Sequence, residues 1–281
     1  MKDYVVTTIA LLLLVFGATL TIDIEDLLYP PAIQQVIAPL LITTLVFRIF
    51  TSVQVSKLWF WAGIPLGITS SAICLLSLLY NVEGADGFEQ KIAYSLISLG
   101  YGLAASMLGL TFMGYKSNAA SEFEEDVPLT LRLLVGSAVL ACLLVSTESL
   151  IGLSGLLNPS AGLLVFSVLL LGAYKSKTGA RADGIMSGFV FGSLACVFVG
   201  LVGYLFSGLD PRGLGPATET GLLGIIYSGL GVVGATIFFQ TKELSQSSVE
   251  RKNWHLMEIY ALWVLMCFAP MSLRESFSFV H

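Results

Sequence analysis

The chain has 281 residues, of which 56% are hydrophobic and only 12% are charged, and its formal net charge is −5. A soluble domain carries about twice that charged fraction, so most of this surface does not face water. The few basic residues are spread along the chain, which excludes a nucleic-acid-binding surface.

Long apolar stretches follow one another along the whole chain. A helix of about 20 apolar residues can cross the hydrocarbon core of a bilayer. The candidate spans are residues 4–21, 29–50, 58–80, 92–114, 130–151, 160–174, 184–207, 219–240 and 256–273. Residues 4–21 follow Lys2 as a signal peptide would, but the next span begins within about ten residues, so we interpret them as a retained helix. The sequence therefore predicts an all-α, polytopic transmembrane protein with 8–9 spans.

The positions of Lys and Arg predict the orientation. If the N-terminus is cytoplasmic, the outer connections between the first eight spans contain only Lys91 and Arg212. The inner segments contain Lys2, Arg48, Lys57, Lys116, Arg132, Lys175, Lys177, Arg181, Lys242, Arg251 and Lys252. Basic residues near span ends resist translocation, which favours a cytoplasmic N-terminus in a membrane of the bacterial inner-membrane type. Arg274 would then lie outside and opposes a complete ninth crossing.

Several segments occur twice. Residues 27–48 read LLYPPAIQQVIAPLLITTLVFR, and residues 156–177 read LLNPSAGLLVFSVLLLGAYKSK, with a shared opening 129 residues apart. In the fourth and eighth candidate spans, Leu96 and Tyr101 match Leu222 and Tyr227 at an offset of 126. Offsets that change only at loops indicate a duplicated unit. An even number of four spans per unit predicts two parallel repeats, 1–117 and 127–243, followed by a C-terminal hydrophobic helix and tail at 244–281.

Small residues recur at four-residue spacing in the repeated spans. Such residues share one ridge of a helix and let two backbones approach closely. We expect helix packing at Gly63, Gly67, Gly102, Gly184, Gly188 and Gly192.

The strings GLLNPSAGLLV, IPLGITSSA and LGPATETGLLGIIYSGLGVVGATIFF, in this helix order, resemble the membrane module of the MotA/TolQ/ExbB superfamily. The resemblance implies an ion-driven energy-coupling or proton-channel subunit that surrounds a partner's single transmembrane helix carrying an Asp. The chain departs from the family because it lacks the large cytoplasmic domain. The second copy has Met186 where Pro65 would be expected and Gly224 where the first has Ser98.

Hydroxyl groups within the third and fourth spans are the candidate ion-path or partner-facing groups. In the family that the chain resembles, such hydroxyls line a lumen, and a hydroxyl can orient water without titrating. The candidates are Pro65, Thr69, Ser70, Ser98 and Ser106, with Glu148 near the outer end of the fifth span. We expect the first copy to face the lumen or partner and the second to serve as a packing wall. The alternative is that each hydroxyl bonds to its own helix or to a neighbouring helix.

Other polar and aromatic residues near span ends have simpler interpretations. Gln34 and Gln35 are expected at the outer interface, and Glu258 at the inner interface. Trp59, Trp61 and Trp254 fit an aromatic belt. The sequence contains no hydrolase, metalloprotease or nucleotide-binding motif and no metal-ligand spacing, so it predicts neither an enzyme nor a cofactor.

Two functions remain open. The first is the ion-linked subunit, with membrane lipid, further copies or other subunits, and a single-span Asp-bearing protein as partners. The second is a small-solute transporter or a structural, membrane-embedded assembly subunit without ion conduction.

Overall fold

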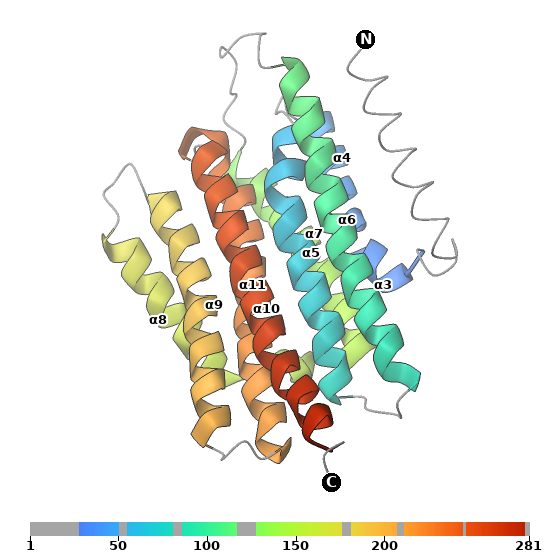
Figure 1. Cartoon of the computed structure of the whole chain (residues 1–281). Helices are drawn as coiled ribbons and strands as arrows, with labels where there is room; N and C mark the ends of the chain where they lie inside the picture. The colour runs from blue at the N-terminus through green and yellow to red at the C-terminus, as the bar shows by residue number, and fades with distance from the viewer. Residues whose placement is uncertain are drawn as a thin grey trace.

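The computed structural model describes residues 28–50, 55–80, 86–116, 128–175, 181–206, 211–243 and 246–278, which form a bundle of helices (Figure 1). The predicted span at 4–21 lies outside the described residues. In chain order the elements are α3 (Pro30–Ala32), η1 (Ile33–Ile37), α4 (Ala38–Phe50), α5 (Val55–Tyr80), α6 (Asp86–Lys116), α7 (Leu129–Ile151), η2 (Leu153–Leu156), α8 (Pro159–Lys175), α9 (Arg181–Phe206), α10 (Pro211–Glu243) and α11 (Gln246–Ser278). No strand occurs in these ranges, and the prediction of an all-α protein is confirmed.

Six stretches of the described chain are long and apolar enough to cross a membrane. They are Pro30–Ile49, Ser56–Leu78, Gln90–Leu110, Leu129–Ile151, Arg181–Gly203 and Thr218–Phe239. These helices indicate a multi-pass membrane protein. Pro159–Tyr174 is a shorter apolar helix, and the predicted span 256–273 lies within α11. A total of 8–9 spans and the orientation in the membrane stay predictions.

Local sequence explains where several helices begin and end. α3 opens with prolines, which lack the N–H that a first helical turn leaves unpaired. α7 ends at Gly152, whose φ of 73° is a conformation that suits glycine. α8 begins after Asn158, whose side-chain Oδ1 accepts hydrogen bonds from the backbone N–H groups of Ser160 and Ala161 at 3.1 and 3.2 Å.

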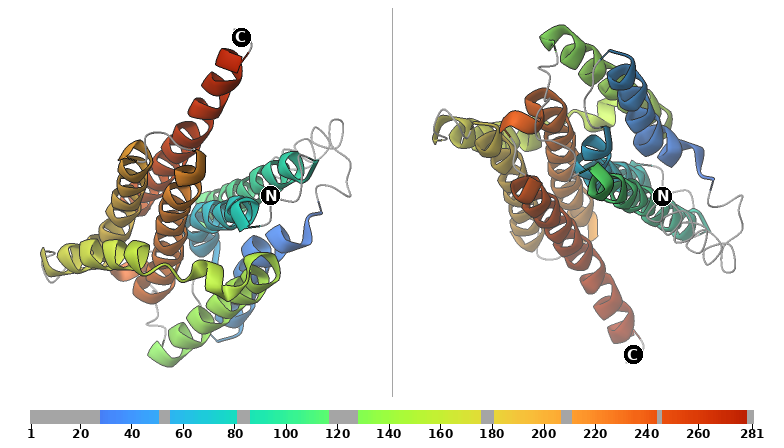
Figure 2. Two further views of the ribbon diagram at one scale, coloured as in Figure 1. Left: turned by 90° about the horizontal axis from the view of Figure 1, so that it is seen from below. Right: turned by 90° about the horizontal axis from the view of Figure 1, so that it is seen from above.

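α5 lies at the centre of the bundle, and α7 and α8 lie at its edge (Figure 2). Within its candidate span, 94% of α5 is buried inside the protein, against 22% of α7. The outer surface of α7 and α8 carries large exposed apolar side chains, including Leu133, Leu134, Val145, Leu163, Phe166 and Leu171. Apolar surface of this extent is typical of contact with lipid or with another membrane protein.

The two predicted glycine ridges pack against different neighbours. On α5, a Cβ added at Gly67 would lie 2.8 Å from the Cα of Gly102 on α6, the helix that follows. On α9, a Cβ added at Gly188 would lie 2.8 Å from the Cα of Leu169 on α8, the helix that precedes. The α5 ridge therefore faces forward along the chain, and the α9 ridge faces backward.

A shift of one residue accounts for this difference. Cys74 of α5 contacts Ser98 of α6, and Cys196 of α9 lies where a Cβ at Gly224 of α10 would be. These two contacts match at an offset of 122 on α5 and α9, whereas the glycine ridges match at 121. One residue turns a helix face by about 100°, so the glycines of α9 point toward another helix. The parallel duplication of 1–117 and 127–243 stays a prediction.

Candidate functional site

The candidate site follows the central helix α5, where buried polar groups succeed one another inside an apolar bundle. We call this set the α5 polar line, and define it by its α5 members and their partners on other elements. The α5 members are Trp61, Pro65, Thr69, Ser70, Ser71 and Cys74, and the partners are Gln35 of η1, Ser98 and Ser106 of α6, and Asn253 and Tyr260 of α11. A polar group buried in apolar surroundings costs free energy unless it is hydrogen-bonded. The partners therefore decide what the line can do.

Pro65 interrupts the hydrogen bonding of α5, and α11 compensates for it. A proline has no N–H, so the carbonyl of Trp61, four residues earlier, has no donor within the helix. The side-chain Nδ2 of Asn253 donates to that carbonyl at 3.1 Å. Asn253 is only 2% exposed, so this contact connects α11 to α5 in the interior.

Ser106 of α6 bonds to the same turn of α5. Its hydroxyl donates to the carbonyl of Phe60 at 3.1 Å and accepts from the N–H of Ile64 at 3.0 Å. Gly63 makes this contact possible, because a Cβ at that position would lie 2.5 Å from the Ser106 Oγ. The turn that precedes Pro65 is therefore bonded to both α6 and α11.

The three hydroxyls after Pro65 have three different partners. Thr69 donates to the Pro65 carbonyl of its own helix at 2.7 Å. Ser70 donates to Oε1 of Gln35 at 2.6 Å, and Ser71 shares a hydrogen bond with the Tyr260 hydroxyl at 2.5 Å. These side chains connect α5 to η1 on one side and to α11 on the other.

Ser98 lies further along the line, on α6. It donates to the Tyr94 carbonyl at 2.9 Å and lies 3.7 Å from the Cys74 sulfur. The ring of Tyr94 stacks on Tyr29, with a centroid distance of 3.8 Å. Tyr29 directly precedes α3, and burial raises the pKa of its hydroxyl, which keeps it protonated. The hydroxyls of the line thus connect to a stacked tyrosine pair.

Three polar atoms of the line have no hydrogen-bond partner among the described residues. They are Gln35 Nε2, Trp61 Nε1 and Asn253 Oδ1. Gln35 is fully buried and Trp61 is 2% exposed. Two donors and one acceptor in the interior are groups to which water or another polar species can bond.

The structure brings five of the six predicted site residues together and places the sixth elsewhere. Pro65, Thr69, Ser70, Ser98 and Ser106 all belong to the α5 polar line. They are covered by this chain's own η1, α6, α10 and α11, rather than lying open for a partner's helix. Glu148 is exposed near the end of α7, where its Oε2 accepts from the Leu153 N–H at 2.6 Å and caps the turn before η2.

The predicted packing glycines lie at helix contacts. Gly63 and Gly67 of α5 pack on α6 around Gly102 and Ser106. Gly172 of α8 packs on Gly184 and Gly188, and Gly192 packs on Val165. The glycines thus position α5 against α6, which aligns the hydroxyls of the line, and α9 against α8.

Two interpretations of the sequence are wrong. Gln35 was expected at the interface together with Gln34, but only Gln34 is exposed, because the π-helical turn of η1 directs Gln35 onto α5. Trp61 was expected in an aromatic belt, but it is buried between α5 and its neighbours, while Trp254 is 51% exposed. Glu258 is exposed, as expected of an interfacial residue, and pairs with His255 at 3.0 Å.

Sequence reasoning also missed Asn253 and Tyr260. Their role depends on α11 packing beside α5, a contact between residues 192 and 189 positions apart. The only signal was Pro65 itself, because a proline within a span requires a donor from elsewhere for the carbonyl that it leaves unpaired.

Comparison with protein-family models, with curated proteins and with solved structures found no match for this chain. The function is therefore argued from the site alone.

Proposed function

We propose that the chain is the membrane-embedded subunit of an ion-linked complex, as its resemblance to the MotA/TolQ/ExbB superfamily suggests. In this proposal the α5 polar line is the functional element. One observation carries it: the central, most buried helix has polar partners on three other elements and leaves three polar atoms without a partner. A helix that served only as an apolar core would need none of these groups.

The chemistry of the line suits the passage of protons or small ions. A hydroxyl both donates and accepts, so Thr69, Ser70 and Ser71 can exchange hydrogen bonds with water without changing charge. The described members of the line include no carboxylate, so the titrating group would come from another molecule. We infer that a single-span partner with a membrane Asp supplies it at one end of the line. Since η1, α6, α10 and α11 already cover the line, the partner is not required to surround it.

The proposal is tested by ion flux in vesicles. The protein, purified with any single-span protein that accompanies it, is reconstituted with a pH-sensitive dye inside, and flux is driven by a potassium diffusion potential. We expect flux above that of empty vesicles, and a loss of most of it in the variant Thr69→Val with Ser70→Ala. The matched control is Ser137→Ala with Ser167→Ala, two exposed hydroxyls that bond only to their own helices. Flux no greater than that of empty vesicles, or an equal loss in both variants, contradicts the proposal.

A second candidate function is a structural assembly subunit that conducts no ions. It is favoured by the hydrogen bonds that Thr69, Ser98 and Ser106 donate to backbone carbonyls of this chain. Under this alternative, the Thr69 and Ser70 variant lowers the thermal stability and the yield of assembled complex, and vesicles containing the unmodified protein show no flux.

A further inference from the structure

A groove of about 540 Å³ lies between α9 and α11, apart from the α5 polar line. Both helices start at the same end of the bundle and run in the same direction (Figure 1). On α9 the lining begins at Asp183 and Ser187 and continues to Leu194. On α11 it begins at Arg251 and continues to Leu262. Each wall covers eleven residue steps, about 16 Å at 1.5 Å per residue.

The two walls change from polar to apolar in the same order. The starting end holds Asp183, Arg251, Lys252 and His255, and the far end holds Phe191, Leu194, Ile259 and Leu262. A ligand that matches such a groove has a polar head and an apolar tail. Its volume lies within the usual range for small-molecule sites, about 300–1,000 Å³.

The charges at the polar end favour an anionic head group. Lys252 forms an ion pair with Asp183 at 2.7 Å, and His255 contacts Glu258 at 3.0 Å, so both acids already have cationic or potentially cationic partners. Arg251 is the remaining charged group of the groove, and its side chain is exposed. A guanidinium can donate two parallel hydrogen bonds to a phosphate, which makes phosphate its best-matched anion.

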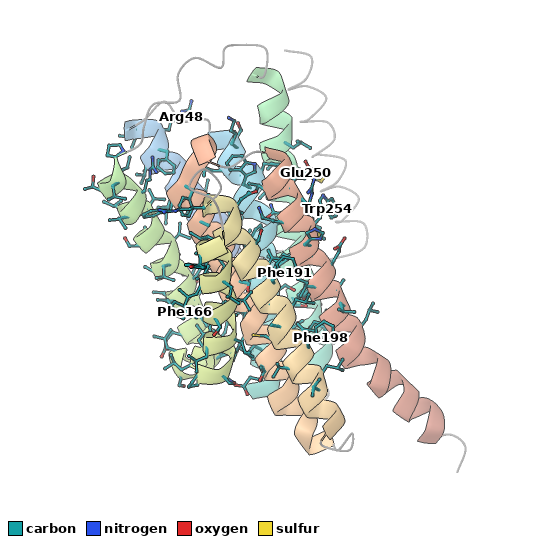
Figure 3. The ribbon with its side chains drawn as sticks, turned by 90° about the vertical axis from the view of Figure 1, so that its left-hand side faces the viewer. Arg48, Phe166, Phe191, Phe198, Glu250 and Trp254 are labelled. Carbon is teal, nitrogen blue, oxygen red and sulfur yellow. The ribbon has the colours of Figure 1, made fainter. Side chains whose placement is uncertain are left out.

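The surface beside the groove continues this pattern. Phe191 and Phe198 of α9 are 59% and 51% exposed, and Trp254 of α11 is exposed near the polar end. Figure 3 shows these aromatic side chains on the face formed by α9 and α11, with Trp254 beside Glu250 and with Phe198 furthest from them. Tryptophan is typical of the head-group level of a bilayer, and exposed phenylalanine fits the acyl region.

We propose that this groove binds a membrane glycerophospholipid. Its phosphate bonds to Arg251, and one acyl chain lies along Phe191, Leu194 and Leu262. A free phosphate would occupy only the polar end and would leave the apolar two-thirds of the walls without a ligand. The lipid is therefore the occupant that matches both ends.

The test uses phospholipid that carries a photoreactive diazirine in one acyl chain, in nanodiscs that contain the full-length protein. After illumination, mass spectrometry maps the labelled peptides. We expect labelling concentrated on α9 and α11, reduced about tenfold by Arg251→Gln, the size expected for loss of one charge-assisted contact. Arg48→Gln is the matched control, because Arg48 is an exposed cation of α4 that does not line this groove.

Further arms separate the lipid from other occupants and from misfolding. Ser187→Trp, which fills the groove without removing a charge, should displace the lipid, and a diacylglycerol probe without phosphate should label the groove no more than phospholipid labels Arg251→Gln. Excess inorganic phosphate should leave the labelling unchanged, so competition by it would indicate a phosphate site and overturn the proposal. Labelling that spreads over α7 and α8 as their exposure dictates, or that ignores both groove variants, also overturns it. Because the two lipid probes are compared on the unmodified protein, a variant that fails to fold leaves the test intact.

Discussion

α5 and α9 each precede a long helix and pack tightly against it, yet their buried groups are of different kinds. On α5, Ser70 and Ser71 bond to other elements, and the carbonyl of Trp61 receives a donor from α11. On α9, Ser193 donates to the Val190 carbonyl of its own helix, and the glycine ridge packs on α8. Hydrogen bonds between elements fix direction, whereas close glycine packing provides contact area. The comparison assigns polar function to α5 and packing to α9.

The largest expected effect comes from closing the α5–α6 contact. Gly67→Leu should destabilise the protein by about 3 kcal/mol or more, because the Cα of Gly102 leaves no room for a side chain. Thermal unfolding in detergent measures the effect. Gly100→Leu on α6 is the control, since a Cβ there meets nothing within 4 Å. Equal melting temperatures for the two variants would show that the two backbones do not approach closely.

The same change on α9 should have a smaller effect. Gly188→Leu should cost about 1–3 kcal/mol, because α8 lies at the edge of the bundle and can move away from the added side chain. Gly203→Leu is the matched control on the same helix, again with nothing within 4 Å of a Cβ. If Gly188→Leu melts like Gly203→Leu, the ridge of α9 does not pack on α8.

The Asn253 contact can be isolated by a double-mutant cycle. Asn253→Ala should cost about 1–2 kcal/mol, because it leaves the buried Trp61 carbonyl without a donor. In a Pro65→Ala background the cost should be smaller, because alanine restores the N–H that can bond to that carbonyl within α5. His255→Ala, an exposed neighbour on α11, is the control. Additive effects of the Pro65 and Asn253 changes would contradict the compensation between the two residues.

The smallest effect is expected at Glu148, outside the line. Glu148→Ala should cost about 0.5–1 kcal/mol, the usual net value of one hydrogen bond, because the Leu153 N–H at an exposed turn can bond to water instead. Flux in the vesicle assay should be unchanged. A loss of flux comparable to that of the Thr69 and Ser70 variant would place Glu148 in the ion path and break the separation drawn here.

The sequence predicts the helices better than their neighbours. Apolar runs placed spans at 58–80 and 130–151, close to α5 (Val55–Tyr80) and α7 (Leu129–Ile151). Spacing also located the glycine ridges, because four-residue periodicity is a property of a single helix. Which helix each ridge meets depends on rotation about the helix axis, where an error of one residue changes the neighbour.

The candidate site was predictable to the same extent. Thr69, Ser70 and Ser106 stood out because hydroxyls are conspicuous inside apolar spans. Gln35 and Asn253 did not stand out, because each lies near a helix end in the sequence and becomes buried only when η1 and α11 pack beside α5. Contacts between distant segments leave no local pattern.

Two native cysteines offer the most direct test of the central claim, that α5 carries a polar path and α9 does not. Cys74 lies on the α5 polar line and Cys196 lies on α9, and both are almost completely buried, at 2% and 0% exposure. Each is kept in turn while the other three cysteines are replaced by alanine, and the rate of modification by a small water-soluble methanethiosulfonate is measured in membrane vesicles. Water along the line should let Cys74 react several times faster than Cys196. Equally slow modification of both, or faster modification of Cys196, would contradict the account.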